Sequence, residues 1–191
     1  ISSLARYGVC FDEGAAADGE TEKGSYGPYR QSMRKEIYQT FAKDLVRKGL
    51  AYPCFCSAEE LDEIRKAQEA VKADMGYYGS YAKCRDLSIE EIEANIKDGK
   101  EYVLRLRSDG NAENKITCRD LIRGNIEMPE NIMDVVLLKS DGIPTYHYAH
   151  VVDDYLMGTT HVIRGDEWIS SYPLHEQLFR VSGLKMPKYA H

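Results

Sequence analysis

The feature that most constrains the fold is a strand that runs directly into charged and aromatic residues. Residues 158–168 read GTTHVIRGDEW, in which Thr160–Ile163 has the pattern of a short buried strand. Arg164 follows at its carboxyl end, the edge at which open α/β sheets bind their ligands. A helix is predicted before this strand, over residues 146–157, and another after it, ended by Gly183. This order predicts an α/β layer with a functional edge at Arg164.

Composition narrows the class of protein. Hydrophobic residues make up 43% of the 191 residues, which is enough to bury a core. The formal net charge of −6 excludes a protein that coats nucleic acid non-specifically, but leaves room for a local basic face. No stretch approaches about 18 consecutive apolar residues and no signal-peptide pattern is present, so we expect a soluble, cytoplasmic protein without a membrane partner. Because the chain starts at Ile1 rather than methionine and stops at His191, we expect an excised piece of a longer protein.

An inserted α+β unit is predicted near residues 53–142. Before it, apolar residues at three- and four-residue steps predict a helix over residues 31–48. Within it, the pairs Ser57–Glu60 and Ser88–Glu91 are capping boxes that open two charged helices. Several short strands are predicted around these helices. The chain is therefore expected to form an α/β layer that the inserted unit interrupts.

The candidate ligand site is centred on Arg164. Tyr146 and His150 are four residues apart in the predicted helix and so share one of its faces. The fork of donors on an arginine at a strand end suits a carboxylate or a phosphate. The alternative is that Arg164 forms a structural ion pair with Asp154 or Asp166.

The five cysteines form an odd and sparse set, which favours reduced thiols or a metal site over disulfides. Cys54, Cys56 and Cys84 lie on either side of one predicted helix, and three converging thiols are suited to a tetrahedral zinc ion. The fourth ligand would be Tyr81 or Asp86. The alternative is a group of buried thiols without a metal.

Two pairs of arginines are candidates for binding RNA phosphates. Arg30 and Arg34 lie in GPYRQSMR, at a loop-to-helix junction where free backbone amides also favour anions. Arg105 and Arg107 alternate with apolar residues in EYVLRLR, and are expected to face solvent. For both pairs the alternative is ordinary solvated surface.

Four segments carry a resemblance to a known family. They read GPYRQSMR, GLAYPCFCSAEEL, LKSDGIPTYHYAHVVDDYLMGTTHVIRGDEW and HEQLFRVSGLKMPKYAH. Together they strongly resemble the glutamyl-tRNA synthetases of class I, and the similarity extends over nearly the entire chain. The resemblance implies an α/β fold class, namely part of a Rossmann-type class I synthetase catalytic domain interrupted by an α+β connective insertion. Residues 1–52 would be the first Rossmann segment, residues 53–142 the insertion that binds the tRNA acceptor end, and residues 143–191 the return to the Rossmann layer.

The same resemblance implies roles for individual residues. The counterparts of Tyr146 and Arg164 line the amino-acid pocket, and those of Glu167 and Trp168 lie beside the adenylate. His150 stands where many relatives have asparagine. The implied enzyme is a monomeric glutamate–tRNA ligase that uses ATP and Mg²⁺ to form glutamyl-adenylate, and then transfers the glutamyl group to the 3′ end of tRNA. No side chain of this chain is expected to act as a nucleophile.

Two sequence signatures of this family are missing, and three other classes of protein remain as alternatives. Neither the His-Ile-Gly-His nor the Lys-Met-Ser-Lys-Ser type of ATP signature is present, so we expect both to lie outside an excised piece that is inactive alone. One rival is the enzyme that glutamylates queuosine in tRNA, whose zinc site resembles Cys54, Cys56, Tyr81 and Cys84. The others are the glutaminyl enzyme and a non-catalytic RNA-binding module on the same scaffold.

Overall fold

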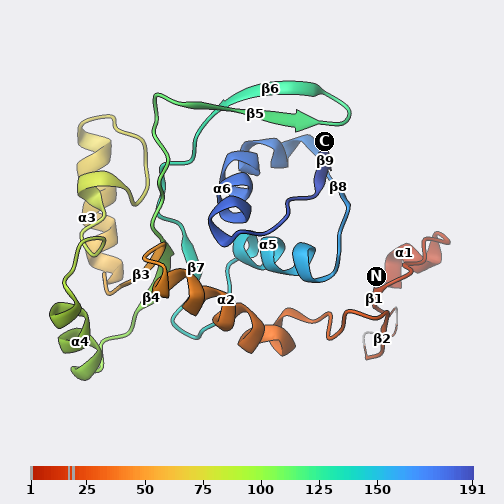
Figure 1. The fold of residues 1–191 in the computed structure, drawn as a ribbon, viewed down its shortest axis with the longest axis horizontal. Helices are drawn as coiled ribbons and strands as arrows, with labels where there is room; N and C mark the ends of the chain where they lie inside the picture. The colour runs from red at the N-terminus through yellow and green to blue at the C-terminus, as the bar shows by residue number, and fades with distance from the viewer. Residues whose placement is uncertain (1, 17, 19) are drawn as a thin grey trace.

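The computed structural model describes residues 2–16, 18 and 20–191, and Figure 1 shows their arrangement. The chain opens with an arm made of α1 (Ser2–Arg6), β1 (Gly14–Ala15), β2 (Glu22–Lys23) and the 3-10 helix η1 (Gln31–Arg34). Within residues 13–28, β1 and β2 pair as a short antiparallel hairpin. Ala17 and Gly19 of that segment lie outside the described residues.

The predicted first long helix is confirmed as α2 (Lys35–Arg47), with its first turn formed by η1. Its buried residues Tyr38, Ala42 and Leu45 recur at steps of four and three, so they share one face. This face packs into the main core together with α5 (Tyr146–Leu156) and α6 (Tyr172–Ser182).

Three antiparallel strands form the first sheet, in the order β3 (Ala51–Cys54), β4 (Val103–Leu106) and β7 (Val136–Leu138). The main core covers one face of this sheet. On the other face lies a second apolar cluster, which includes Ile64 of α3 (Ala58–Ala70). Arg105 lies on this second face, with its guanidinium 4.1 Å from the centre of the Tyr77 ring. The prediction that Arg105 faces solvent is wrong, because both faces of β4 are covered.

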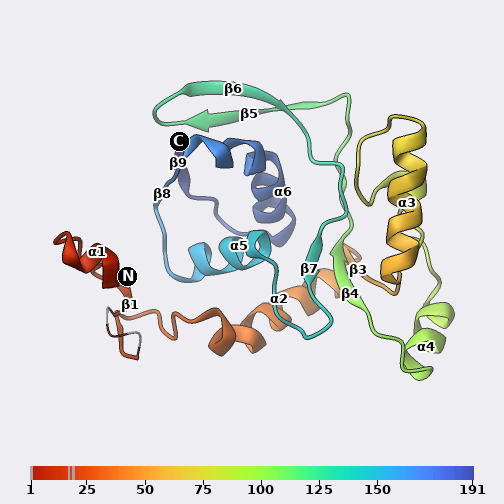
Figure 2. The same cartoon turned by 180° about the vertical axis from the view of Figure 1, so that it is seen from behind.

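Both predicted capping boxes are confirmed. Ser57 opens α3 and Ser88 opens α4 (Ile89–Lys97), and in each case the side chain accepts from the backbone amide of a glutamate three residues later. The 3-10 helix η2 (Gly79–Tyr81) lies between the two helices. Figures 1 and 2 show α3 and α4 together on the outer side of the first sheet.

The second sheet joins the segment predicted to be an inserted unit, residues 53–142, to the C-terminal layer. Its order is β6 (Gly124–Pro129), β5 (Lys115–Asp120), β9 (Lys188–Ala190) and β8 (His161–Ile163). β5 and β6 form an antiparallel hairpin, whereas β9 pairs in parallel with both β5 and β8. In both views the hairpin reaches across the end of the molecule that contains α6 and the C-terminus (Figures 1 and 2).

The C-terminal layer follows the predicted helix–strand–helix order. α5 precedes β8, and Arg164 follows β8 directly. The next residues form the 3-10 helix η3 (Asp166–Ser171) before α6 begins, and α6 ends at Gly183 in the left-handed conformation, with φ 67°. None of the helices in the described part of the chain is long and apolar enough to span a membrane.

Arg34 is part of this core rather than of the surface. Its side chain is 2% exposed, its Nε donates to Asp153 at 2.8 Å, and its Nη1 donates to the backbone carbonyls of Tyr26 and Pro28. The second oxygen of Asp153 accepts from the hydroxyl of Tyr38 at 2.7 Å. Arg34 therefore ties the N-terminal arm and α2 to α5, and its guanidinium is not available to RNA.

We predict that Arg34→Met lowers the free energy of unfolding by about 3–5 kcal/mol, because it leaves the carboxylate of Asp153 without its charged partner. Urea denaturation measures this change. Arg47→Met is the control, since Arg47 is 81% exposed in its ion pair with Asp44 and its loss should lie within the error of the measurement. Equal effects of the two substitutions would contradict the structural role given to Arg34.

Candidate functional site

Two nitrogen atoms of the Arg164 guanidinium have hydrogen-bond partners, and the third has none among the described residues. Its Nε donates to Nε2 of His191 at 3.0 Å, and its Nη2 lies 3.2 Å from Nδ1 of His175. Its Nη1 is inaccessible to solvent and has no hydrogen-bond partner among the described residues. A buried donor without a partner is costly, so this nitrogen is available to a ligand.

The alternative of a structural ion pair is not what the structure shows. Asp166 pairs with Arg123, and Oδ2 of Asp154 lies 3.1 Å from Nδ1 of His150. Within the described residues, Arg164 forms no ion pair with a carboxylate. The positive charge of Arg164 is therefore not neutralised by a contacting carboxylate.

Aromatic rings surround the guanidinium. Its central carbon lies 4.8 Å from the ring centre of Tyr189 and 5.7 Å from that of Trp168. The Tyr146 ring is 4.8 Å from that of Trp168 and is stacked on His150, with 6.1 Å between centroids and an interplanar angle of 11°. The structure thus brings together Tyr146, His150, Arg164 and Trp168, which come from α5, β8 and η3.

Glu167 is placed differently from these four residues. It is exposed at the start of η3. A Cβ atom at Gly165 would lie only 2.3 Å from a Glu167 carboxylate oxygen, so the glutamate folds back over the backbone that follows Arg164. Gly165 leaves the space that this side chain occupies.

The histidines of the site are held in the neutral form. Burial, with help from the charge of Arg164 and from His147, lowers the pKa of His150 to about 4. Burial likewise lowers the pKa of His175 to about 2, and that of His147 below its ordinary value. Neutral histidines leave the guanidinium as the positive charge of this pocket, which favours an anionic ligand.

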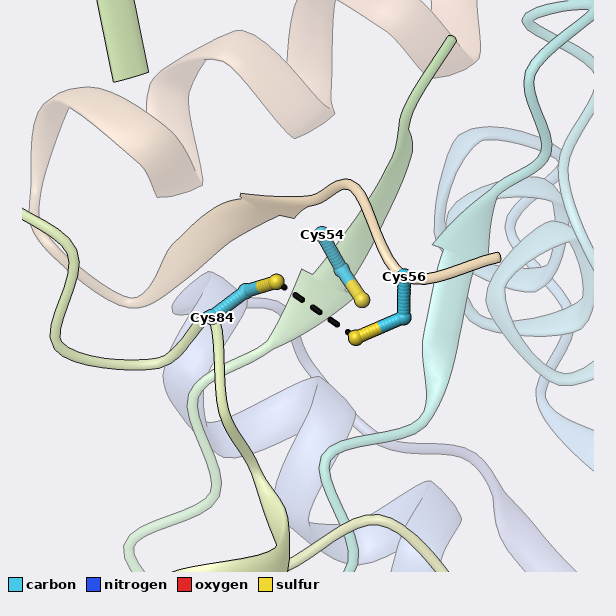
Figure 3. A group of neighbouring side chains, drawn as sticks. All are labelled: Cys54, Cys56 and Cys84. Atoms are coloured by element: carbon cyan, nitrogen blue, oxygen red, sulfur yellow. Dashed lines mark hydrogen bonds between the residues drawn. The ribbon is translucent and has the colours of Figure 1, made fainter. Parts of the chain in front are cut away.

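The three predicted metal-binding cysteines lie together, as Figure 3 shows. The Sγ atoms of Cys54, Cys56 and Cys84 are all within 4.8 Å of one another, and those of Cys56 and Cys84 are 3.6 Å apart. Hydrogen bonds from the other two thiols lower the pKa of Cys54. A zinc ion with Zn–S bonds of about 2.3 Å would hold two sulfur atoms about 3.8 Å apart, so the cluster has the right dimensions.

The hydroxyl group that meets these thiols belongs to Tyr77. It lies 3.5 Å from the Sγ of Cys54 and 3.3 Å from that of Cys56, and it accepts from the backbone amide of Cys84 at 3.0 Å. Tyr81, which was expected in this position, instead packs its ring edge-on against Tyr78. Tyr81 lies within η2 and is partly buried against the same apolar cluster.

The four candidate RNA-binding arginines divide into two pairs. Arg34 and Arg105 are buried, so the prediction that they contact phosphates is corrected for both. Arg30 is exposed and lies 3.9 Å from Glu22. Arg107 is half-buried, with its Nη1 2.9 Å from Asp86. Arg30 and Arg107 come from different ends of the fold and do not form one basic surface.

Sequence reasoning missed the residues that hold Arg164 in place. His175, Tyr189 and His191 fall in a helix, a strand and the last position of the chain, and Asp120 is about 70 residues away in sequence from His191, to which it is bonded at 2.7 Å. The one available signal was the number of histidines and tyrosines in the C-terminal quarter. No local pattern indicated that these residues converge.

A half-buried arginine at the carboxyl end of a strand, among aromatic and neutral histidine side chains, defines a pocket for a small anionic ligand. Residues 14–191 match the family model for the class I tRNA synthetases (E and Q), catalytic domain. The chain therefore belongs to the catalytic-domain family of class I glutamyl- and glutaminyl-type tRNA synthetases.

Relatives with known names agree with this assignment. The glutamate–tRNA ligase of Clostridium beijerinckii is 56% identical to this chain, in an alignment that covers all of this chain and 34% of that protein. The glutamate–tRNA ligase of Acetivibrio thermocellus is 53% identical, in an alignment that covers all of this chain and 35% of that protein. Among solved structures, a glutamate tRNA ligase from Elizabethkingia meningosepticum, in complex with its amino acid, is 37% identical with a TM-score of 0.80. That match covers 88% of this chain and 34% of the other. The chain thus spans about a third of the length of these relatives.

We predict that His150→Asn makes the protein less sensitive to acid. His150 stays neutral in the fold while the unfolded chain takes up a proton below about pH 6.5, so its contribution to stability is complete above that pH and is lost as the pH falls toward about 4. Removing it should reduce the decline in the free energy of unfolding by up to about 1.4 kcal/mol per pH unit in this range.

Urea denaturation at half-unit steps from pH 7 to pH 4 measures this slope. His161→Asn is the matched control, because His161 is exposed in β8. The assignment fails if the two variants have the same slope.

Proposed function

We propose that this chain is the central part of a glutamate–tRNA ligase, which activates glutamate with ATP and transfers it to the 3′ end of tRNA. The observation that carries the proposal is Nη1 of Arg164, a buried charged donor without a partner among the described residues. A carboxylate satisfies such a donor with a charge-assisted hydrogen bond. The names of the relatives support glutamate as the source of that carboxylate.

The roles of the side chains follow from this arrangement. Arg164 binds a carboxylate of the substrate, and the rings of Tyr146 and Trp168 exclude water from that contact. His150 lines the same pocket in its neutral form. Glu167, which is exposed and folds back over Gly165, would lie beside the adenylate.

Catalysis in this scheme rests on positioning. The carboxylate of glutamate attacks the α-phosphorus of ATP and releases pyrophosphate, and the ribose hydroxyl at the 3′ end of tRNA then takes the acyl group and releases AMP. Mg²⁺, when bound with ATP, would neutralise phosphate charge. A fixed orientation and stabilisation of charge supply the rate enhancement, so no side chain of this chain has to form a covalent intermediate.

The remaining parts of the proposal concern partners and surroundings. The inserted unit would bind the acceptor end of tRNA. Of the four candidate arginines, Arg30, which precedes that unit, and Arg107, which belongs to it, are accessible to solvent and could contact phosphates. The whole enzyme would act as a monomer in the cytoplasm. The chain by itself would not activate glutamate, because it lacks both ATP signatures.

We also propose that Cys54, Cys56 and Cys84 hold a zinc ion with the hydroxyl of Tyr77 as the fourth ligand. The support is the dimensions of the thiol cluster and the position of Tyr77 against two of its sulfur atoms. A closed tetrahedral site of this kind is structural. It would fix the end of β3 against the segment that follows η2.

The role of Arg164 is tested by Arg164→Lys in the natural full-length protein that carries these residues. Lysine keeps the charge but loses the planar fork, so the KM for glutamate should rise roughly ten- to a hundredfold while that for ATP barely changes. Pyrophosphate exchange with each substrate varied separately measures both constants. Arg123→Lys, at the exposed pair with Asp166, should change neither, and an unchanged glutamate KM in a folded Arg164→Lys variant would refute the assignment.

The zinc proposal is tested by metal analysis of protein purified without chelator, which should contain about one zinc ion per chain. Cys84→Ser should lose the metal, and Tyr77→Phe should release it to a chelator faster than the unaltered protein. Tyr81→Phe is the control and should behave like the unaltered protein. If no zinc is found and all thiols titrate freely, the cysteines are ordinary core residues.

A further inference from the structure

A carboxylate from the inserted unit is buried behind Arg164. Asp120, at the end of β5, has a fully buried side chain. Its Oδ1 accepts from the backbone amides of Ile122 and Arg123, both at 2.9 Å. Its Oδ2 accepts from the backbone amide of His191 at 3.0 Å and lies 2.7 Å from Nδ1 of that residue. Burial raises the pKa of Asp120, but the opposite effect of these hydrogen bonds is larger and brings the pKa down to about 2. The carboxylate is therefore charged.

The ring of His191 connects this carboxylate to Arg164. A guanidinium has only donors, so Nε2 of His191 must accept the hydrogen bond from Nε of Arg164. Because Nε2 accepts, the ring carries its proton on Nδ1 and donates it to Asp120. A carboxylate behind a histidine fixes both its tautomer and its orientation, as it does for histidines that bind metals.

The same reasoning applies to His175. Its Nδ1 must accept from Nη2 of Arg164, so its proton lies on Nε2 and points to Nδ1 of His147 at 2.9 Å. Two acceptors thus hold the planar guanidinium. With the plane of the group fixed, Nη1 keeps one direction.

We propose that Asp120 is a positioning residue for substrate binding, which acts through the Nδ1–H tautomer of His191 to hold Arg164 with Nη1 toward the substrate carboxylate. The proposal rests on the function proposed above for Arg164. It assigns to the inserted unit a part in binding the amino acid, since Asp120 belongs to β5.

Asp120→Asn tests this connection because an amide cannot accept on both sides. Its oxygen can serve either the two backbone amides or His191, and its NH₂ group must face the other pair of donors. Of these donors, only the imidazole can adapt, by moving its proton to Nε2. That proton would then oppose the Nε–H of Arg164, and the guanidinium would have to move.

The tautomer of His191 is measured by ¹⁵N NMR of histidine-labelled protein, with the signal assigned by its loss in His191→Gln. We expect the Nδ1–H form in the unaltered protein and a loss of that form in Asp120→Asn. A predominant Nε2–H form in the unaltered protein would overturn the proposal, independently of any enzyme assay.

The functional consequence is measured by pyrophosphate exchange in the natural full-length protein. Asp120→Asn should raise the KM for glutamate roughly threefold to tenfold, the effect of one weakened hydrogen bond, and leave that for ATP unchanged. The matched control is Glu127→Gln. Glu127 lies in β6, the partner strand of β5, where its exposed side chain accepts from the hydroxyl of Thr117 at 2.7 Å.

Four further outcomes decide between the roles. If Glu127→Gln changes the glutamate KM as much as Asp120→Asn does, or if Asp120→Asn affects both substrates alike, Asp120 is merely structural. If Arg164→Lys raises the glutamate KM and Asp120→Asn does not, the positioning role fails while the proposed function stands. If Arg164→Lys has no effect, the proposed function fails and the role of Asp120 fails with it.

A second pair of variants keeps the test decisive if Asp120→Asn does not fold. His191→Gln retains an oxygen that can accept from Arg164, whereas His191→Leu has no acceptor. The glutamine variant should therefore keep a glutamate KM several-fold lower than the leucine variant does, with equal KM values for ATP. Equal glutamate KM values in the two variants would overturn the role of the acceptor.

Discussion

The parallel pairing of β5 with β9 holds the inserted unit against the layer that carries Arg164. The two strands are in register at one pair, Asp120 with Tyr189, and the backbone amide of Leu121 extends the pairing by donating to the carbonyl of Tyr189. Short pairing of this kind is weak unless side chains support it. The bonds from Asp120 to His191 supply that support, and they also place the histidine that holds Arg164.

Three buried or half-buried arginines show how the fold distinguishes structure from function. Arg34 has a carboxylate and two carbonyls as partners, so its charge is compensated within the protein. Arg105 donates to the carbonyl of Asp134 and lies over Tyr77, within the inserted unit, and its Nε has no hydrogen-bond partner among the described residues. Arg164 has neutral acceptors and rings, and its Nη1 likewise has no partner there. Arg105 is enclosed between two apolar layers, whereas Arg164 is half-buried at the end of a strand, so of these two it is Arg164 that a ligand can reach.

Local patterns predicted the elements well, while placement depended on contacts distant in sequence. The capping boxes at Ser57 and Ser88 and the stop at Gly183 were predictable because each involves residues within a few positions. Arg105 was misplaced because alternation reveals two faces of a strand but not whether a second layer covers the outer one. Tyr81 was named with Asp86 as a possible fourth ligand and from a resemblance to a related zinc site, whereas the hydroxyl that meets the thiols belongs to Tyr77. His191 had no local signal, since its partners come from β5 and β8.

The inserted unit contacts the C-terminal layer at a second place, through hydrogen bonds to Gln177 of α6. Nε2 of Gln177 donates to Ser108 and Asp109, both at 2.8 Å, and its Oε1 accepts from Asn131 at 2.7 Å. Gln177 lies two residues after His175, so the contact that fixes this turn of α6 also fixes the second acceptor of Arg164. Both acceptors are therefore anchored by residues of the inserted unit, one through β5 and one through the segment after β4. The position of the Arg164 guanidinium therefore depends on the contacts that residues 53–142 make with His191 and with α6.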